Sequence, residues 1–149
     1  MKRIERIVDL YREEERTKSM EMADCQKYYD EQLDTYTRLI EYALEYKKEH
    51  ARSAAEGISA SMIANYNNFM ARLRLTTDQQ TLVLENAQHE LENAVQQWKL
   101  TRSKKMILVK LNDRLDKERS YNIDRREQSL QDDAAAARCS ITRPQRLLD

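Results

Sequence analysis

Residues 46–69 read YKKEHARSAAEGISASMIANYNNF and include Gly57, the only glycine of the 149-residue chain. Glycine turns freely because it has no Cβ atom, and it commonly follows the last residue of a helix. The single proline, Pro144, lies far from this stretch. So few turn residues nearly exclude an all-β or α/β fold. The stretch predicts one turn between two long helices, with Ser59 or Ser61 as the N-cap of the second helix.

Before the turn, apolar side chains recur with the spacing of a coiled coil. From Ile4 to His50, steps of four and three residues meet fourteen positions, and ten of them are apolar or aromatic. A frame that starts at Ile7 soon meets charged and polar residues and fails. The first frame predicts a narrow apolar strip along one helix face, here called the seam. Its positions are Ile4, Val8, Tyr11, Glu15, Lys18, Met22, Cys25, Tyr29, Gln32, Tyr36, Leu39, Ala43, Tyr46 and His50.

After the turn, a second frame continues the seam. Two successive steps of four, through Thr76, Gln80 and Leu84, predict a local stutter. The second frame consists of Met62, Tyr66, Phe69, Leu73, Thr76, Gln80, Leu84, Ala87, Leu91, Ala94, Trp98, Thr101, Lys105, Leu108, Leu111 and Leu115.

The two frames mirror each other across Gly57. Paired residue numbers, such as those of Tyr46 and Phe69, add up to about 115–116 throughout, as an antiparallel hairpin requires. We therefore predict an all-α fold, a long antiparallel two-helix coiled-coil hairpin that forms a single domain over residues 1–137. The expected bounds are about 3–53 for helix one, about 54–59 for the turn, about 60–137 for helix two and 138–149 for a flexible tail.

Composition limits the function. Twenty-six basic residues balance 26 acidic ones, so no net charge attracts nucleic acid or anionic lipid. No apolar run approaches the roughly 20 residues of a membrane helix, and the first residues lack the apolar core of a secretory signal. His50 and His89 have no cysteine or carboxylate partners at metal-ligand spacing, and no glycine-rich loop exists to bind phosphate. We expect a cytoplasmic protein without catalytic residues, metal or cofactor.

Two surface features favour protein partners. Residues 78–92 carry only acidic charges, whereas residues 99–126 carry ten basic residues against four acidic ones. The basic stretch is either a solvated face or a docking end for an acidic protein surface. Apolar residues beside the seam either widen it or form a partner site near the turn. These residues are Tyr28, Leu33, Ile40, Tyr42, Ile63 and Met70.

Several motifs follow one another in order over most of the chain. They are LIEYALEY at 39–46, Gly57, NYNNF at 65–69 followed by Leu73 and Gln79 or Gln80, Trp98 with Lys104-Lys105, and RREQ at 125–128 with DDA at 132–134. This series resembles the flagellar export protein family FliJ. The resemblance implies a non-enzymatic stalk and chaperone-escort component of the flagellar type III export apparatus. Its implied partners are the hexameric export ATPase (FliI-like), the export gate protein (FlhA-like) and export chaperones, at the cytoplasmic face of the inner membrane.

The resemblance also implies which residues bind these partners. The gate-binding surface matches Leu39, Tyr42, Tyr46, Phe69 and Leu73, and Tyr42 is the clearest candidate because it lies beside the seam. Thr76 and Gln80 extend that surface only weakly. We hypothesise that the basic open end of the hairpin enters or caps the ATPase ring. The candidate residues there are Arg3, Arg6, Lys104, Lys110 and Arg114.

Other readings remain open. The chain also fits the stalk of a virulence type III secretion system, or a passive structural coiled-coil rod. A membrane-surface helix is disfavoured, because the polar faces mix both charge signs. The sequence leaves undecided the orientation in the ring, the escorted chaperones and the oligomeric state.

Overall fold

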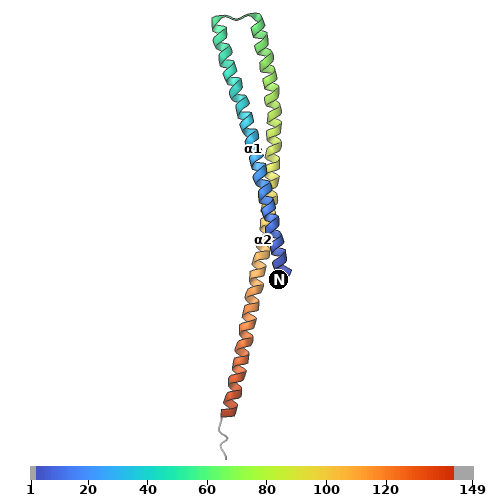
Figure 1. Ribbon diagram of the computed structural model, residues 1–149, viewed down its shortest axis with the longest axis vertical. Helices are drawn as coiled ribbons and strands as arrows, with labels where there is room; N and C mark the ends of the chain where they lie inside the picture. The colour runs from blue at the N-terminus through green and yellow to red at the C-terminus, as the bar shows by residue number, and fades with distance from the viewer. Residues whose placement is uncertain (1–2, 143–149) are drawn as a thin grey trace, which may run out of the picture. The chain divides into compact units, whose positions relative to one another are not determined.

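The computed structural model describes residues 3–142, and these residues form two α-helices without any strand. Helix α1 spans Arg3–Glu56 and helix α2 spans Ala60–Thr142 (Figure 1). The two helices pack against each other, so the predicted all-α helical hairpin is confirmed.

Both helices extend further than the sequence analysis expects. Helix α1 ends at Glu56 rather than near residue 53, and α2 continues to Thr142 rather than ending near residue 137. The residues added to α1 include Ala54 and Ala55, and alanine is the strongest helix former. In α2, the four alanines at 134–137 lie directly before the added residues and favour continuation of the helix. The expected tail over 138–149 is therefore helical as far as Thr142, and its remaining residues lie outside the described ones.

The turn between the helices is built from Gly57 and Ser59. Gly57 has a φ of +93°, in the region that favours glycine, and its N–H donates to the carbonyl oxygen of Ala54 at 3.2 Å. The hydroxyl oxygen of Ser59 accepts the N–H of Met62 at 3.3 Å, and its carbonyl oxygen accepts that of Ile63 at 3.2 Å. Ser59, rather than Ser61, is thus the N-cap of α2.

The chain divides into two compact units. One unit comprises Tyr11–Ser103, and the other comprises Met1–Leu10 with Lys104–Asp149. The first is called the tip unit because it contains the turn, and the second is called the end unit. The single domain expected over residues 1–137 stays a prediction.

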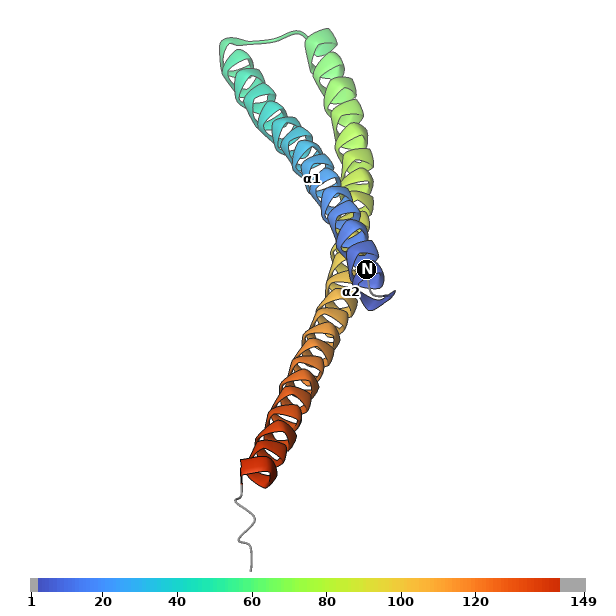
Figure 2. The same cartoon turned by 60° about the horizontal axis from the view of Figure 1, so that its bottom comes forward.

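In the tip unit, the helical segments on either side of the turn run antiparallel (Figures 1 and 2). Both views show the segments diverging toward the turn, where residues 51–57 and 59–65 are all exposed. Further from the turn, Leu73 is 8% exposed and Ala87 1%. A two-helix structure buries only a strip, so most seam residues are half-buried rather than fully enclosed.

The first predicted frame is confirmed by burial. All fourteen of its positions on α1, from Ile4 to His50, are buried or half-buried. Even Glu15 and Lys18, which are charged, lie among the half-buried residues. Periodicity therefore identified the correct face despite polar interruptions.

The predicted stutter in the second frame is wrong. Thr76 is exposed, whereas Thr77 is half-buried, and the hydroxyl of Thr77 donates to the carbonyl oxygen of Leu73 at 2.8 Å. With Thr77 in place of Thr76, the steps from Leu73 to Leu84 are four, three and four, so the heptad continues without interruption. The same register places Met70, rather than Phe69, directly in the seam.

In the end unit, the seam involves few residues. Val8 is 4% exposed, and Leu108 and Val109 are half-buried. The predicted seam positions Leu111 and Leu115 are 43% and 40% exposed, whereas Asn112 and Asp116 are half-buried. The step of four from Leu108 to Asn112 keeps the heptad, but the next half-buried residue, Asp116, is four residues further on, where a regular heptad takes three. From Lys117 to Ser140, every side chain of α2 is exposed.

Candidate functional site

Five rings cluster between the two helices near the turn. Tyr46 lies at the centre, with its ring centroid 4.4 Å from that of Phe69 and 5.5 Å from that of Tyr66. Tyr42 meets Phe69 edge-on at 5.9 Å, and His50 stacks on Tyr66 at 3.6 Å. Aromatic pairs of this kind add about 0.5–1.5 kcal/mol each beyond the area that they bury. This aromatic cluster therefore joins the helices where they begin to diverge.

The structure brings three of the five gate-binding candidates into direct contact. Tyr42, Tyr46 and Phe69 touch through their rings, whereas Leu39 is half-buried and Leu73 is buried in the seam. Tyr42 is 51% exposed, and the other four are buried or half-buried. Its place beside the seam agrees with the sequence analysis, but its ring contacts also give it a packing role.

Two members of the cluster are absent from the candidate set. Tyr66 and His50 occupy seam positions on opposite helices, and their stacked rings lie closer to the turn than any other ring contact of the described residues. The mirrored frames could have paired them, because their residue numbers also add up to about 116.

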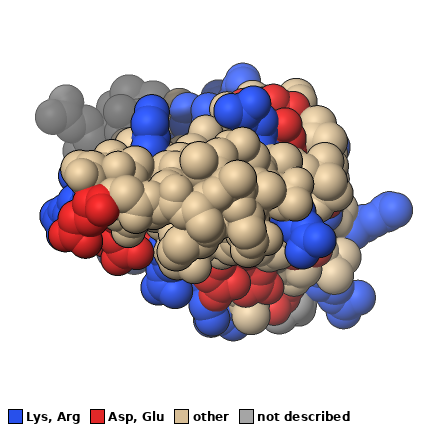
Figure 3. All heavy atoms as spheres, turned by 90° about the horizontal axis from the view of Figure 1, so that it is seen from above, with Lys and Arg blue, Asp and Glu red and all other residues tan. Residues whose placement is uncertain are grey.

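The turn and the beginning of α2 carry no charged side chain. Residues 57–71 contain no Asp, Glu, Lys or Arg, although such residues make up 35% of the chain. Met62 and Ile63 are 55% and 44% exposed there. Figure 3 looks down on this end and shows uncharged surface bordered by basic and acidic side chains. The aromatic cluster therefore adjoins a surface that a partner can cover without the energetic cost of desolvating charged side chains.

The five ATPase-binding candidates all belong to the end unit, and all are exposed. Lys110 and Arg114 are one helical turn apart on the same face of α2, whereas Lys104 points about 120° away from Lys110. Arg114 already pairs with Glu118, with Nε and Oε1 3.4 Å apart. The candidates thus give the unit exposed positive charge, but not a single patch.

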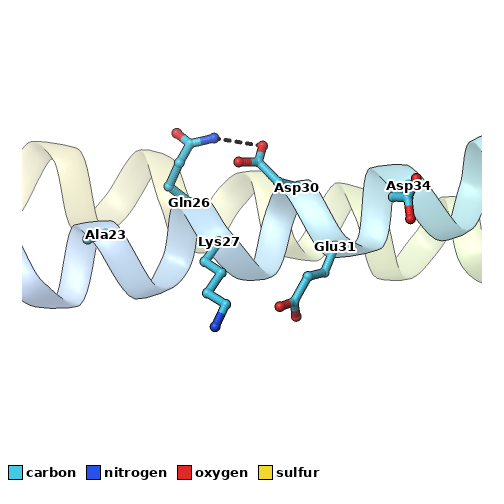
Figure 4. Close-up of a pocket in the computed structure, with 6 residues that line it drawn as sticks. All are labelled: Ala23, Gln26, Lys27, Asp30, Glu31 and Asp34. Carbon is cyan, nitrogen blue, oxygen red and sulfur yellow. Dashed lines mark hydrogen bonds between the residues drawn. The ribbon is translucent and has the colours of Figure 1, made fainter.

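Acidic residues also gather on the outer face of α1. Asp30, Glu31 and Asp34 line a shallow surface hollow with Gln26 and Lys27 (Figure 4). Gln26 donates to Asp30 at 3.0 Å, and Glu31 points away from that pair. Asp34 pairs with Arg38 at 2.9 Å. Among the described residues, no group of His, Cys, Asp and Glu is arranged to hold a metal ion.

None of the helices in the described part of the chain is both long and apolar enough to cross a membrane.

The fold and these surfaces define the class of antiparallel helical-hairpin proteins. Within that class, the model of the family described as flagellar FliJ protein matches residues 1–144, and the chain belongs to this family. It is therefore a flagellar, export-related protein, which implies protein partners. No curated protein and no solved structure matches the chain.

Proposed function

We propose that the protein is a non-enzymatic stalk and chaperone-escort component of the flagellar type III export apparatus. It binds the hexameric export ATPase, promotes assembly of the ring, docks on the export gate protein and hands on export chaperones. It works in the cytoplasm, at the cytoplasmic face of the inner membrane. Membership of the FliJ family over residues 1–144 is the observation that carries this proposal.

The aromatic cluster supports docking on the gate. Tyr42 offers an exposed ring that is held in place by Tyr46 and Phe69. Aromatic side chains that are fixed before binding lose little conformational freedom when a partner covers them. Leu39 and Leu73 lie in the seam, where they support the cluster rather than meet a partner directly.

The positive charge of the end unit supports binding to the ATPase. Arg3, Arg6, Lys104 and Lys110 are exposed, and exposed charge increases the rate at which oppositely charged proteins associate. A single stalk in a six-fold ring cannot contact all subunits alike. By binding the assembled ring better than free subunits, it shifts the equilibrium toward the ring by mass action.

The first test measures ATP hydrolysis by the purified export ATPase with and without this protein, while sedimentation follows ring assembly. We expect faster hydrolysis together with more hexamer. If neither changes while circular dichroism shows the hairpin folded, the stalk function is wrong.

A matched pair of charge reversals refines this test. Lys110→Glu lies in the end unit and Lys47→Glu in the tip unit, and both residues are exposed. We expect Lys110→Glu to reduce the stimulation of hydrolysis and Lys47→Glu to leave it unchanged. Equal effects of the two variants would argue against the end unit as the ATPase-binding region.

A further inference from the structure

The positions that flank the seam carry an unusual pattern on α1. In a coiled coil, the seam consists of heptad positions a and d, and the neighbouring e and g positions usually carry charges. Within the tip unit, the burial register of α1 assigns position g to residues 14, 21, 28, 35, 42, 49 and 56. The first two and the last two of these are glutamates, but the three in the middle are Tyr28, Thr35 and Tyr42.

Helix α2 continues the same uncharged strip. Its g positions across from this region are Phe69, Thr76 and Val83, and the next one is Glu90. The contact between Tyr42 and Phe69, at 5.9 Å between ring centroids, shows that the g positions of the two helices share one flank. At the same spacing, Thr35 lies across from Thr76. Together these six residues form what we call the g strip.

The g strip is accessible. Tyr28 and Tyr42 are 43% and 51% exposed, and Thr35 and Thr76 are also exposed. Phe69 and Val83 on α2 are half-buried and form its floor beside the seam. A helix with apolar residues at a, d and g presents a face wide enough for two neighbours, but the described residues provide only one.

The hydroxyl donors at the centre of the g strip already have hydrogen-bond partners. The Thr35 hydroxyl donates to the carbonyl oxygen of Glu31 at 3.1 Å, and that of Thr76 donates to the carbonyl oxygen of Arg72 at 3.0 Å. Covering either threonine therefore leaves no O–H donor unpaired, and an unpaired buried donor is costly.

The opposite flank carries positive charge beside its exposed apolar residues Leu33 and Ile40. There, Lys47 and Arg74 line one shallow hollow together with Asn67, so two positive charges lie near each other. A partner on that side would have to remove water from charged groups, which is costly without compensating ion pairs. The difference between the flanks gives the hairpin one preferred docking side.

Acidic residues mark both ends of the g strip. At the g positions of one end, Glu21 precedes Tyr28 and Glu90 follows Val83, and at the other end Glu49 follows Tyr42. Glu21 also pairs with Lys18 at 3.4 Å, but such an exposed pair contributes little energy. The strip is therefore uncharged along its length and negative at its ends.

We propose that the g strip binds one amphipathic helix of a partner protein, which lies along the hairpin as a third helix. The partner helix has apolar residues at seam spacing over three heptad layers, about 21 Å at 1.5 Å per residue, and Lys or Arg at both ends. The proposal deepens gate docking and rests on that part of the proposed function, because the strip contains Tyr42 and Phe69. It adds Tyr28, Thr35 and Val83 to the site.

The test uses the full chain and fluorescent helical peptides of about 18 residues, enough to span the three layers. The first peptide has leucines at seam spacing and lysines at both ends. The second has glutamates at the ends, and the third is a scrambled version of the first. We expect the first peptide alone to bind saturably, with affinity that falls as salt rises.

Matched variants locate the bound peptide. Thr76→Glu places a carboxylate in the centre of the g strip, and Leu33→Glu places one on the opposite flank, where Leu33 is 40% exposed. We expect Thr76→Glu to weaken binding about tenfold or more and Leu33→Glu to change it less than about twofold, since a carboxylate covered by apolar groups is unfavourable. Circular dichroism checks that both variants stay folded.

Three results would overturn the proposal. The first is that Thr76→Glu and Leu33→Glu weaken peptide binding equally. The second is that the lysine-ended and glutamate-ended peptides bind equally well. The third is that Thr76→Glu sediments differently from the unsubstituted chain, which would show that a second copy of the chain covers the strip. Because no gate protein is present, a failure here is distinct from a failure of gate docking, which the Tyr42→Ala measurement in the Discussion tests separately.

Discussion

Gln80 donates its side-chain amide to two oxygens of Gln32, the backbone carbonyl at 3.0 Å and the side-chain Oε1 at 2.9 Å. The two residues are 48 positions apart and lie in the seam of the tip unit. A polar layer makes an apolar seam less stable than leucines at the same two positions would. It nevertheless fixes one register, because sliding the helices past each other would leave the side-chain amides without hydrogen-bond partners.

Removing this link should destabilise the hairpin. We expect Gln80→Ala to lower the free energy of unfolding by about 1 kcal/mol, through the lost hydrogen bonds and packing. Urea titration followed by circular dichroism measures the change. The matched control is Gln79→Ala, whose side chain is exposed. Similar losses for the two variants would contradict the role given to Gln80.

The seam register predicts opposite outcomes for two leucines on α2. Leu73 is 8% exposed and Leu75 is 59% exposed. We expect Leu73→Ala to cost about 2–3 kcal/mol, because it leaves a gap in the seam, and Leu75→Ala to stay within about 0.5 kcal/mol. Denaturant unfolding of both variants checks this. A larger loss for Leu75→Ala would mean that the register is misassigned.

The cap of α2 makes a third prediction. Ser59→Ala removes the oxygen that accepts the N–H of Met62, and we expect a loss of about 1 kcal/mol. Ser61→Ala should be neutral or slightly stabilising, because alanine is the better helix former. Thermal melts of the two variants decide between the two serines, and a loss confined to Ser61→Ala would reverse the assignment.

Tyr42→Ala separates partner binding from packing. Because the Tyr42 ring contacts Tyr46 and Phe69, we expect a moderate loss of stability, about 1 kcal/mol, rather than none. Binding to the purified export gate protein, measured by calorimetry, should fall at least about tenfold. Tyr121→Ala is the control, since Tyr121 is 66% exposed in the end unit. Unchanged gate binding in Tyr42→Ala would favour a passive rod.

Most of the fold could be predicted because the helices are long and the chain has a single glycine. Spacing alone identified all fourteen seam positions of α1, including the charged Glu15 and Lys18. Two of the errors on α2 share one cause. At Thr76 and Leu111 the prediction breaks the heptad, but the regular register continues and places Thr77 and Asn112 in the seam. The error at Leu115 differs, because a regular heptad does place Leu115 in the seam, yet Leu115 is 40% exposed and Asp116 is half-buried instead.

The candidate site was less predictable for a physical reason. Periodicity shows which face of a helix is buried, so it found Tyr46 and Phe69 near one another. It does not show how rings orient, and thus it missed the stack of His50 on Tyr66. Periodicity also cannot distinguish the two flanks of the seam until the register of both helices is known. A one-residue error at Thr76, for example, moves that residue from the g strip into the seam.

The exposed stretch from Lys117 to Ser140 has a thermodynamic consequence. An isolated helix of this length is held by its own backbone hydrogen bonds and by surface pairs such as Arg114 with Glu118, so it melts gradually and without a sharp cooperative step. The seam of the tip unit melts as one cooperative body. Calorimetry should therefore record a heat of unfolding smaller than the helical content implies, because part of the ellipticity disappears before the main transition begins.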